Sequence, residues 1–156
     1  MNLEPDFSDF IEALKRNDVE FMIVGAFALG HHGAPRATGD FDVWVRPREP
    51  NAKATIKALA DFGFPTINVT PEDILSGKVI QLGVVPVRID ILSDLSGVAA
   101  DEIWDSKVSG RLGPHTVFFI GRETFVKNKR ASGRDKDKAD LTALGEGPSN
   151  AKKKEP

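Results

Sequence analysis

The segment Asp40–Val45 constrains the fold of this chain more than any other part of its sequence. It reads Asp-Phe-Asp-Val-Trp-Val, is rich in residues that favour β-strands, and ends before Pro47. Because side chains alternate along a strand, Asp40 and Asp42 lie on one face while Phe41 and Val43 lie on the other. Two carboxylates about 7 Å apart at Cα repel each other, so proteins rarely place them together without a cation. The segment therefore predicts a strand that packs by one face and presents paired carboxylates from the other.

A third carboxylate occurs in a second apolar strand, Val87–Leu92. Its alternate residues form an apolar face, so Asp90 lies on the opposite face, beside Arg88 and Leu92. A strand of this kind tolerates an Asp only where the carboxylate has a partner. If the two strands are adjacent, the three carboxylates offer the oxygen ligands that Mg²⁺ prefers, in a set able to hold two ions, with Mn²⁺ as an alternative. The other interpretation is that Asp-x-Asp belongs to an edge strand or a turn and binds no metal.

A strand that runs into a tight turn and a helix precedes these carboxylates. Glu20–Val24 is a short apolar strand, Gly25 follows it, and residues 26–32 have the small and apolar character of a short helix. The first amides of a helix have no partner within the helix and can bind phosphate, and a Gly lets the backbone approach it closely. The junction predicts a phosphate-binding turn close to the carboxylates.

The other expected elements are a mixture of helices and strands. Helices are expected over 5–17, 52–62 and 98–107, with a helix start capped by Thr70 at 70–73. Two further helices are expected over 123–131 and 135–144, joined through Gly133. Strands are expected at 78–84 and 66–69, with a hairpin formed by 108–111 and 116–120. Because helices and strands intermix without strict alternation, the fold class is α/β (α+β), with a mixed sheet flanked by helices and a short C-terminal helical segment.

The composition excludes several classes of protein. The 156 residues include no Cys, so disulfide frameworks, Cys-ligated zinc and thiol nucleophiles are excluded. No apolar run approaches the eighteen or so residues that span a bilayer. The acidic N-terminal segment lacks the basic start and apolar stretch of a secretory signal. We expect a cytoplasmic protein with no membrane partner.

Charge is distributed unevenly along the chain. Residues 1–121 carry 11 Lys and Arg against 17 Asp and Glu, whereas residues 122–156 carry 10 against 6. We expect three parts: a core at 1–121, basic helices packed on it at 122–144, and a disordered tail at 145–156. The basic helices are either a solvated surface or a cationic segment that folds over an acidic, metal-loaded cleft and holds a polyanion.

These motifs resemble a known superfamily when they are taken together. The run Val24-Gly25-Ala26, then His32-Gly33, Arg36, Thr38, Asp40 and Asp42, with Asp90 as the third carboxylate, resembles the polymerase-β-like nucleotidyltransferases. It is closest to the minimal branch that includes the nucleotidyltransferase toxins of type IV toxin–antitoxin (abortive infection) systems. The C-terminal residues Lys129, Arg134, Lys136, Asp137 and Asp140 also match that branch, whose second turn Gly is replaced here by Ala26.

The resemblance implies a nucleotidyltransferase fold and a Mg²⁺-dependent transfer of a nucleoside monophosphate from an NTP to an acceptor hydroxyl. Asp40, Asp42 and Asp90 would be both the metal ligands and the catalytic residues. The residues expected to bind nucleotide are Gly25, Ala26, Arg36, Thr38, Lys127, Lys129 and Arg134, with Lys129 as the first choice for the cation on phosphate.

Each of these polar residues also has a structural interpretation. Lys129 could be ordinary surface charge on a helix, and Arg134 could pair with Asp137 one turn later. Arg36 could reach either phosphate or a carboxylate of the core, and Thr38 could order the turn before the strand by hydrogen bonding its backbone.

Substrates and partners are open at this stage. The acceptor could be a tRNA 3′ end, a protein hydroxyl or a small molecule of the aminoglycoside type, and the partner a cognate antitoxin or a second copy of the chain. The alternative to an enzyme is a non-catalytic module of the same fold that binds nucleotide or a partner.

Overall fold

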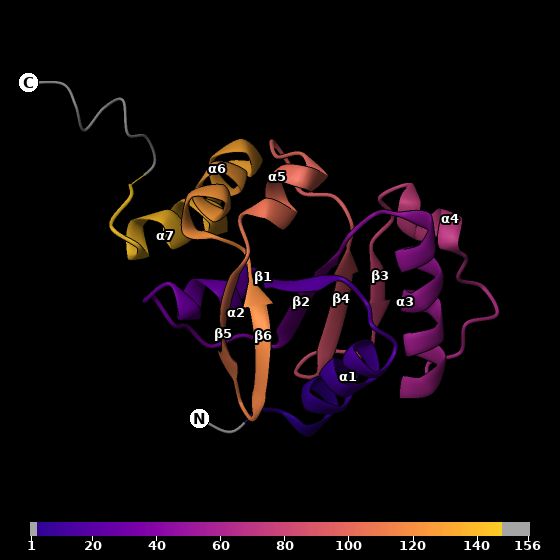
Figure 1. Cartoon of the computed structure of the whole chain (residues 1–156). Coiled ribbons are helices and arrows are strands. Elements are labelled where there is room, and N and C mark those ends of the chain that lie inside the picture. The colour runs from indigo at the N-terminus through magenta and orange to yellow at the C-terminus, as the bar shows by residue number, and fades with distance from the viewer. Residues whose placement is uncertain (1–2, 148–156) are drawn as a thin grey trace, which may run out of the picture.

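A computed structural model describes residues 3–147 of the chain, which form one six-stranded mixed sheet with flanking helices (Figure 1). The strand order is β3-β4-β2-β1-β6-β5. β2 is parallel to β4 and β1 is parallel to β6, whereas the other neighbours are antiparallel. The strands are β1 (Phe21–Val24), β2 (Asp40–Val45), β3 (Ile80–Leu82), β4 (Arg88–Leu92), β5 (Val108–Leu112) and β6 (His115–Phe119). The expected α/β class with a mixed sheet is confirmed.

Helices lie on both sides of this sheet. In Figure 1, α5, α6 and α7 lie above the strands, α1 lies below them, and α3 and α4 lie to the right. The helices are α1 (Pro5–Arg16), α2 (Gly25–His31), α3 (Glu49–Phe62), α4 (Pro71–Leu75), α5 (Ala100–Asp105), α6 (Arg122–Ser132) and α7 (Asp135–Ala143).

The apolar face of β2 forms the centre of the core. Phe41 is fully buried, and the ring of Phe7 from α1 stacks on it with centroids 4.8 Å apart. On the opposite face Trp44 is also fully buried and lies near Trp104 of α5, with ring centroids 6.4 Å apart. Trp44 therefore packs in the core, and only the Asp40 and Asp42 end of that face is left for polar contacts.

Most of the expected helices and strands are present, and the prediction of one strand is wrong. Thr70 caps α4 by accepting from the Asp73 amide while the Asp73 carboxylate accepts from the Thr70 amide, so that helix start is confirmed. Thr66–Val69 is not a strand. The Val69 amide donates to the Thr66 carbonyl at 3.1 Å, which closes a turn, and this local bond prevails over the β-propensity of the segment.

The C-terminal helices turn back on the sheet at Gly133, whose φ of +65° is the left-handed conformation that ends α6. Glu146 forms ion pairs with Arg122 at 2.9 Å and with Arg130 at 3.5 Å, so the chain stays on α6 beyond the end of α7. The remainder of the tail expected at 145–156, residues 148–156, lies outside the described residues.

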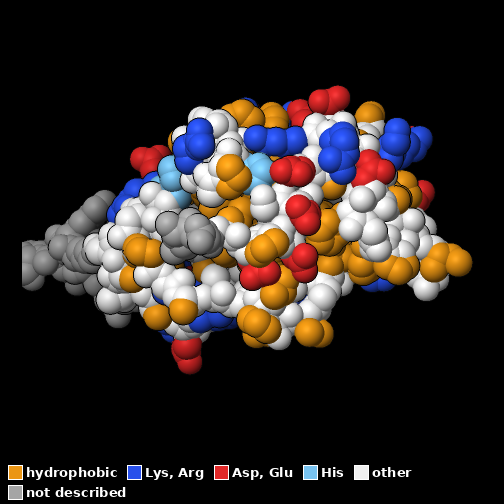
Figure 2. All heavy atoms as spheres, turned by 90° about the horizontal axis from the view of Figure 1, so that it is seen from below, with side chains coloured by type: hydrophobic (Ala, Val, Ile, Leu, Met, Phe, Trp, Pro, Cys, Tyr) orange, Lys and Arg blue, Asp and Glu red, His pale blue; other side chains and the backbone are white. Residues whose placement is uncertain are grey.

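Charged side chains are distributed unevenly over the surface. Figure 2 looks at the molecule from below, onto α1, where acidic side chains gather; those of Asp6, Asp9 and Glu12 from α1 line a groove with Asp61 of α3. Within residues 3–147, none of the helices has the length and apolar character that crossing a membrane requires.

Candidate functional site

The parallel pairing of β2 with β4 gathers the three predicted carboxylates on one face of the sheet. Asp42 lies opposite Asp90 in the register, and Asp40 lies opposite Arg88. Since side chains opposite each other in a sheet share a face, all four point the same way. They line a cavity of about 330 Å³ that α6 and the start of α7 complete from the other side.

Gly25 and Asp42 form one tightly fitted unit in this cavity. Val24, the last residue of β1, pairs with Asp42, so the chain turns into α2 directly beside that carboxylate. Gly25 has a φ of +65°, and a Cβ built there would lie 2.1 Å from Asp42 Oδ2. The glycine is therefore required both by the backbone conformation and by the nearness of Asp42, a packing reason that supplements the expected phosphate turn.

Arg88 contacts two of the three carboxylates. Its Nε and Nη2 donate to Asp90 Oδ1 and Oδ2, both at 3.1 Å, and the same Nη2 donates to Asp40 Oδ2 at 2.9 Å. The hydrogen bond to Asp90 and the neighbouring negative charges raise the pKa of Arg88, so its positive charge is permanent. Residue pattern alone put Arg88 beside Asp90 but gave no sign that it bridges to Asp40.

Asp42 differs from its two neighbours because, within residues 3–147, its carboxylate accepts no hydrogen bond and forms no ion pair. Burial and the like charges of Asp90 and Asp40 raise the pKa of Asp42 to about 6, against the opposing influence of Lys136 and Lys129. An ionised Asp42 is consequently the least compensated charge in the cavity.

The donor chemistry of this set fits a hard divalent cation. Carboxylate oxygens from two adjacent strands face one cavity, and in the described part of the chain no donor contacts the carboxylate of Asp42. With the side chains as they stand, no group of three or more His, Cys, Asp or Glu in the described part of the chain is arranged to hold an ion. Asp40 and Asp90 are engaged by Arg88, and a cation would have to compete for them.

Lys129 enters the cavity from α6 as a buried cation. Its side chain is only 7% exposed, and Nζ lies 3.1 Å from Asp137 Oδ1 and 3.3 Å from Asp140 Oδ2. Lys129 is therefore not surface charge: it lines the cavity, and two carboxylates of α7 hold it there.

Arg36 and Thr38 lie before β2 and have different surroundings. Arg36 lines the cavity, and its Nε donates to Asp140 Oδ1 at 3.0 Å, so of its two expected partners it contacts the carboxylate. Thr38 does not line this cavity. Its Oγ1 accepts from the Asp40 amide at 3.1 Å, which confirms the expected ordering of the turn.

The remaining predicted cations separate into two groups. Arg134 lines the cavity and pairs with Asp137 at 2.8 Å, as its structural interpretation expected. Lys127 does not reach the cavity, because it pairs with Glu102 of α5 at 2.8 Å and is 56% exposed. Lys136, which is not among the predicted nucleotide-binding residues, does line it and has no ion pair within residues 3–147. Its place in the C-terminal motif, directly after Arg134 and Asp135, was the available signal.

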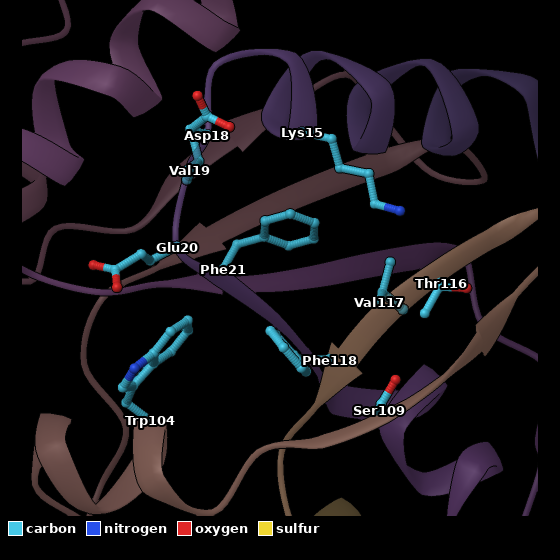
Figure 3. Close-up of a pocket in the computed structure, with 10 residues that line it drawn as sticks. All are labelled: Lys15, Asp18, Val19, Glu20, Phe21, Trp104, Ser109, Thr116, Val117 and Phe118. Carbon is cyan, nitrogen blue, oxygen red and sulfur yellow. The ribbon is translucent and has the colours of Figure 1, made fainter.

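A second cavity, of about 420 Å³, lies at the opposite end of β1 (Figure 3). The rings of Phe21, Trp104 and Phe118 face it, whereas the carboxylates of Asp18 and Glu20 are directed away from these rings. It contains none of the predicted site residues. The carboxylate cavity is therefore where the chemistry expected from the sequence is concentrated.

Comparison of the sequence with protein-family models and with curated proteins found no match in either case.

Proposed function

We propose that this protein is a Mg²⁺-dependent nucleotidyltransferase that transfers a nucleoside monophosphate from an NTP to an acceptor hydroxyl. The observation that carries the proposal is the grouping of Asp40, Asp42 and Asp90 on one sheet face beside Gly25. Cationic side chains of α7, the preceding turn and α6 rim the same cavity. Carboxylates for metal next to cations for phosphate are what transfer from a triphosphate requires.

Different residues of the cavity would bind the metal ions and the phosphates. Asp40 and Asp42 would hold a metal ion on the triphosphate, and Asp90 would share a second. Bound Mg²⁺ supplies neutralisation of phosphate charge and activation of the attacking oxygen. The backbone amides of Gly25 and Ala26, the first of α2, would contact phosphate oxygens. Lys136, which lines the cavity and forms no ion pair within residues 3–147, would supply a cation to the phosphates.

The proposed reaction exchanges one bond at phosphorus for another. The acceptor oxygen forms a bond to the α-phosphorus, the bond from that phosphorus to the bridging oxygen breaks, and pyrophosphate leaves. The hydroxyl proton passes to the carboxylate of Asp90, which faces the same cavity. Positioning and charge compensation supply most of the catalysis in such reactions.

Transfer of label from α-³²P NTPs tests the proposal. Each NTP is incubated with total RNA, with lysate protein and with aminoglycosides, with and without Mg²⁺, and the labelled product is identified. We expect Mg²⁺-dependent transfer that falls by about 100-fold or more in Asp42→Asn. The control is Asp105→Asn at the exposed end of α5, which should transfer at the wild-type rate. Undiminished transfer by Asp42→Asn would contradict the assignment of the site.

The same assay identifies the acceptor class. An RNA acceptor, such as a tRNA 3′ end, would contact the cationic rim and lose label steeply as salt rises. A protein hydroxyl or a cationic small molecule would show a weaker salt dependence. Growth arrest on expression, relieved by a neighbouring gene product acting as antitoxin, would support a toxin-type role.

The ion pairs of Arg88 favour one alternative, a non-catalytic module that binds nucleotide or a partner protein. In such a module Arg88 would compensate Asp40 and Asp90 permanently. Calorimetry with ATP distinguishes the two functions, because the enzyme binds ATP far better with Mg²⁺ and the module binds it equally well without.

A further inference from the structure

Arg88 occupies the oxygens that a metal ion would need. It reaches Asp40 across the pair of parallel strands and Asp90 along its own strand, with three donor–acceptor distances between 2.9 and 3.1 Å. The Asp90 side chain is 11% exposed and that of Asp40 is 28% exposed, so water screens the first pair weakly and the second only in part. The guanidinium therefore bridges Asp40 and Asp90 in the way a bound cation would.

This compensation is incomplete. The guanidinium of Arg88 pairs with only two of the three carboxylates, and Asp42 receives none of its hydrogen bonds. Adding a divalent cation while Arg88 stays in place would put two cations on the same oxygens of Asp40 and Asp90. Because arginine does not lose its proton in proteins, the conflict can be relieved only by movement of the side chain.

We infer that Arg88 is a built-in counter-cation that keeps the metal-free site compact and must leave Asp40 and Asp90 before a divalent cation binds there. The inference rests on the proposed function in that the same carboxylates are taken as the metal ligands. It adds a residue that sets metal affinity without being a ligand. A long and 30% exposed side chain at the cavity wall is able to make this movement without rearranging β4.

Isothermal titration of Mn²⁺ into the nucleotide-free protein tests the inference. Removing the competing charge in Arg88→Gln should tighten Mn²⁺ binding by about tenfold or more. Arg88→Lys keeps the positive charge but loses the two-pronged guanidinium, so its Mn²⁺ affinity should lie between those of Arg88→Gln and the wild type. The matched control is Arg48→Gln, because Arg48 pairs with Glu20 at 3.7 Å outside the cavity, and it should bind as the wild type does.

Thermal unfolding supplies a second measurement that does not depend on activity. In chelator, Arg88→Gln should melt below the wild type because three carboxylates then repel one another, and Mn²⁺ should raise its Tm more than that of the wild type. If Arg88→Gln does not fold in chelator, the Mn²⁺ affinity of Arg88→Lys tests the inference. Tighter binding than in the wild type supports it, and equal binding contradicts it.

The outcomes separate this inference from the proposed function. Equal Mn²⁺ affinities in wild type and both Arg88 variants, together with Mg²⁺-dependent label transfer, would overturn the inference alone. Absence of Mn²⁺ binding in every variant, together with absence of transfer, would overturn both. Binding that appears or tightens only when Arg88 is replaced supports the inference.

Discussion

Two sets of carboxylates differ in how their charges are compensated: one lines the cavity, and the other lies on α7 and pairs with cations that line it. Asp137 and Asp140 on α7 are almost fully buried, and three cations, Lys129, Arg134 and Arg36, hold them. In the set on β2 and β4, Arg88 pairs with Asp40 and Asp90, and Asp42 forms no ion pair within residues 3–147.

The difference separates a structural cluster from a site that is open to a ligand. A buried carboxylate with every oxygen engaged stabilises the fold, because removing it leaves its cations unpaired. A set with excess negative charge costs stability and is retained only where something else compensates it. The following substitutions test this contrast, beginning with the largest expected effect.

Asp137→Asn should destabilise the protein by about 3 kcal/mol, because it removes the carboxylate 3.1 Å from Lys129 and leaves that buried cation only Asp140 at 3.3 Å. Hydrogen bonds from Arg134 and Lys129 outweigh burial and hold the pKa of Asp137 below its usual value. Urea denaturation measures the loss. Asp135→Asn, in the exposed first turn of the same helix, should change the free energy of unfolding by less than about 0.5 kcal/mol.

Gly25→Ala should destabilise by about 1–3 kcal/mol, since its Cβ would meet Asp42 Oδ2 and its φ is +65°. Gly133→Ala is the matched control: φ is +65° there too, and the nearest atom to a Cβ is the Arg130 carbonyl oxygen at 3.8 Å. Gly133→Ala thus measures backbone strain alone. Equal losses in both variants, measured by urea denaturation, would show that contact with Asp42 has no energetic weight.

Asp42→Asn should leave the metal-free protein as stable as the wild type or stabilise it by about 1 kcal/mol, because it removes one of three like charges. The contrast with Asp137→Asn is the sharpest form of the comparison. Denaturation in EDTA at pH 8 measures it, and a loss similar to that of Asp137→Asn would place both carboxylate sets in the same structural category.

The smallest expected effect is a pH dependence of stability that arises from His115 and from neither set of carboxylates. Burial and the nearby charge of Lys15 lower the pKa of His115, whose Nε2 lies 2.6 Å from Ser8 Oγ. A lowered pKa means that the folded state favours neutral His115, so its contribution is present above about pH 6.5 and is lost as pH falls below that value. His115→Gln should flatten the stability profile between pH 7 and pH 5.5, as measured by urea denaturation at each pH. A profile identical to that of the wild type would contradict this origin.

The sequence predicted the site where local rules decide it. Alternation along β2 and β4 placed Asp40, Asp42 and Asp90 on one face, and the residues of the turn placed Gly25 beside them. These expectations need only the period of a strand and the adjacency of two strands.

The ion-pair partners of long side chains could not be predicted from the sequence. Arg36 contacts Asp140, which lies 104 positions later, and Arg88 spans two strands. Several rotamers reach several carboxylates in each case, so only the packed structure decides which pair forms. For the same reason Lys127, a candidate by its position on α6, is directed to Glu102 and away from the cavity.

The parallel pairing of β2 and β4 also has a practical consequence for protein engineering. Strand hydrogen bonds fix Asp42 against Asp90, while the chain between them leaves the sheet through α3 and α4 before it returns. The loop at residues 63–70 lies within that excursion, and its Ile67 is 89% exposed. This loop is therefore suited to carry an inserted epitope or fluorescent reporter, because loop length there adds little closure entropy and leaves the distance between the two strands unchanged.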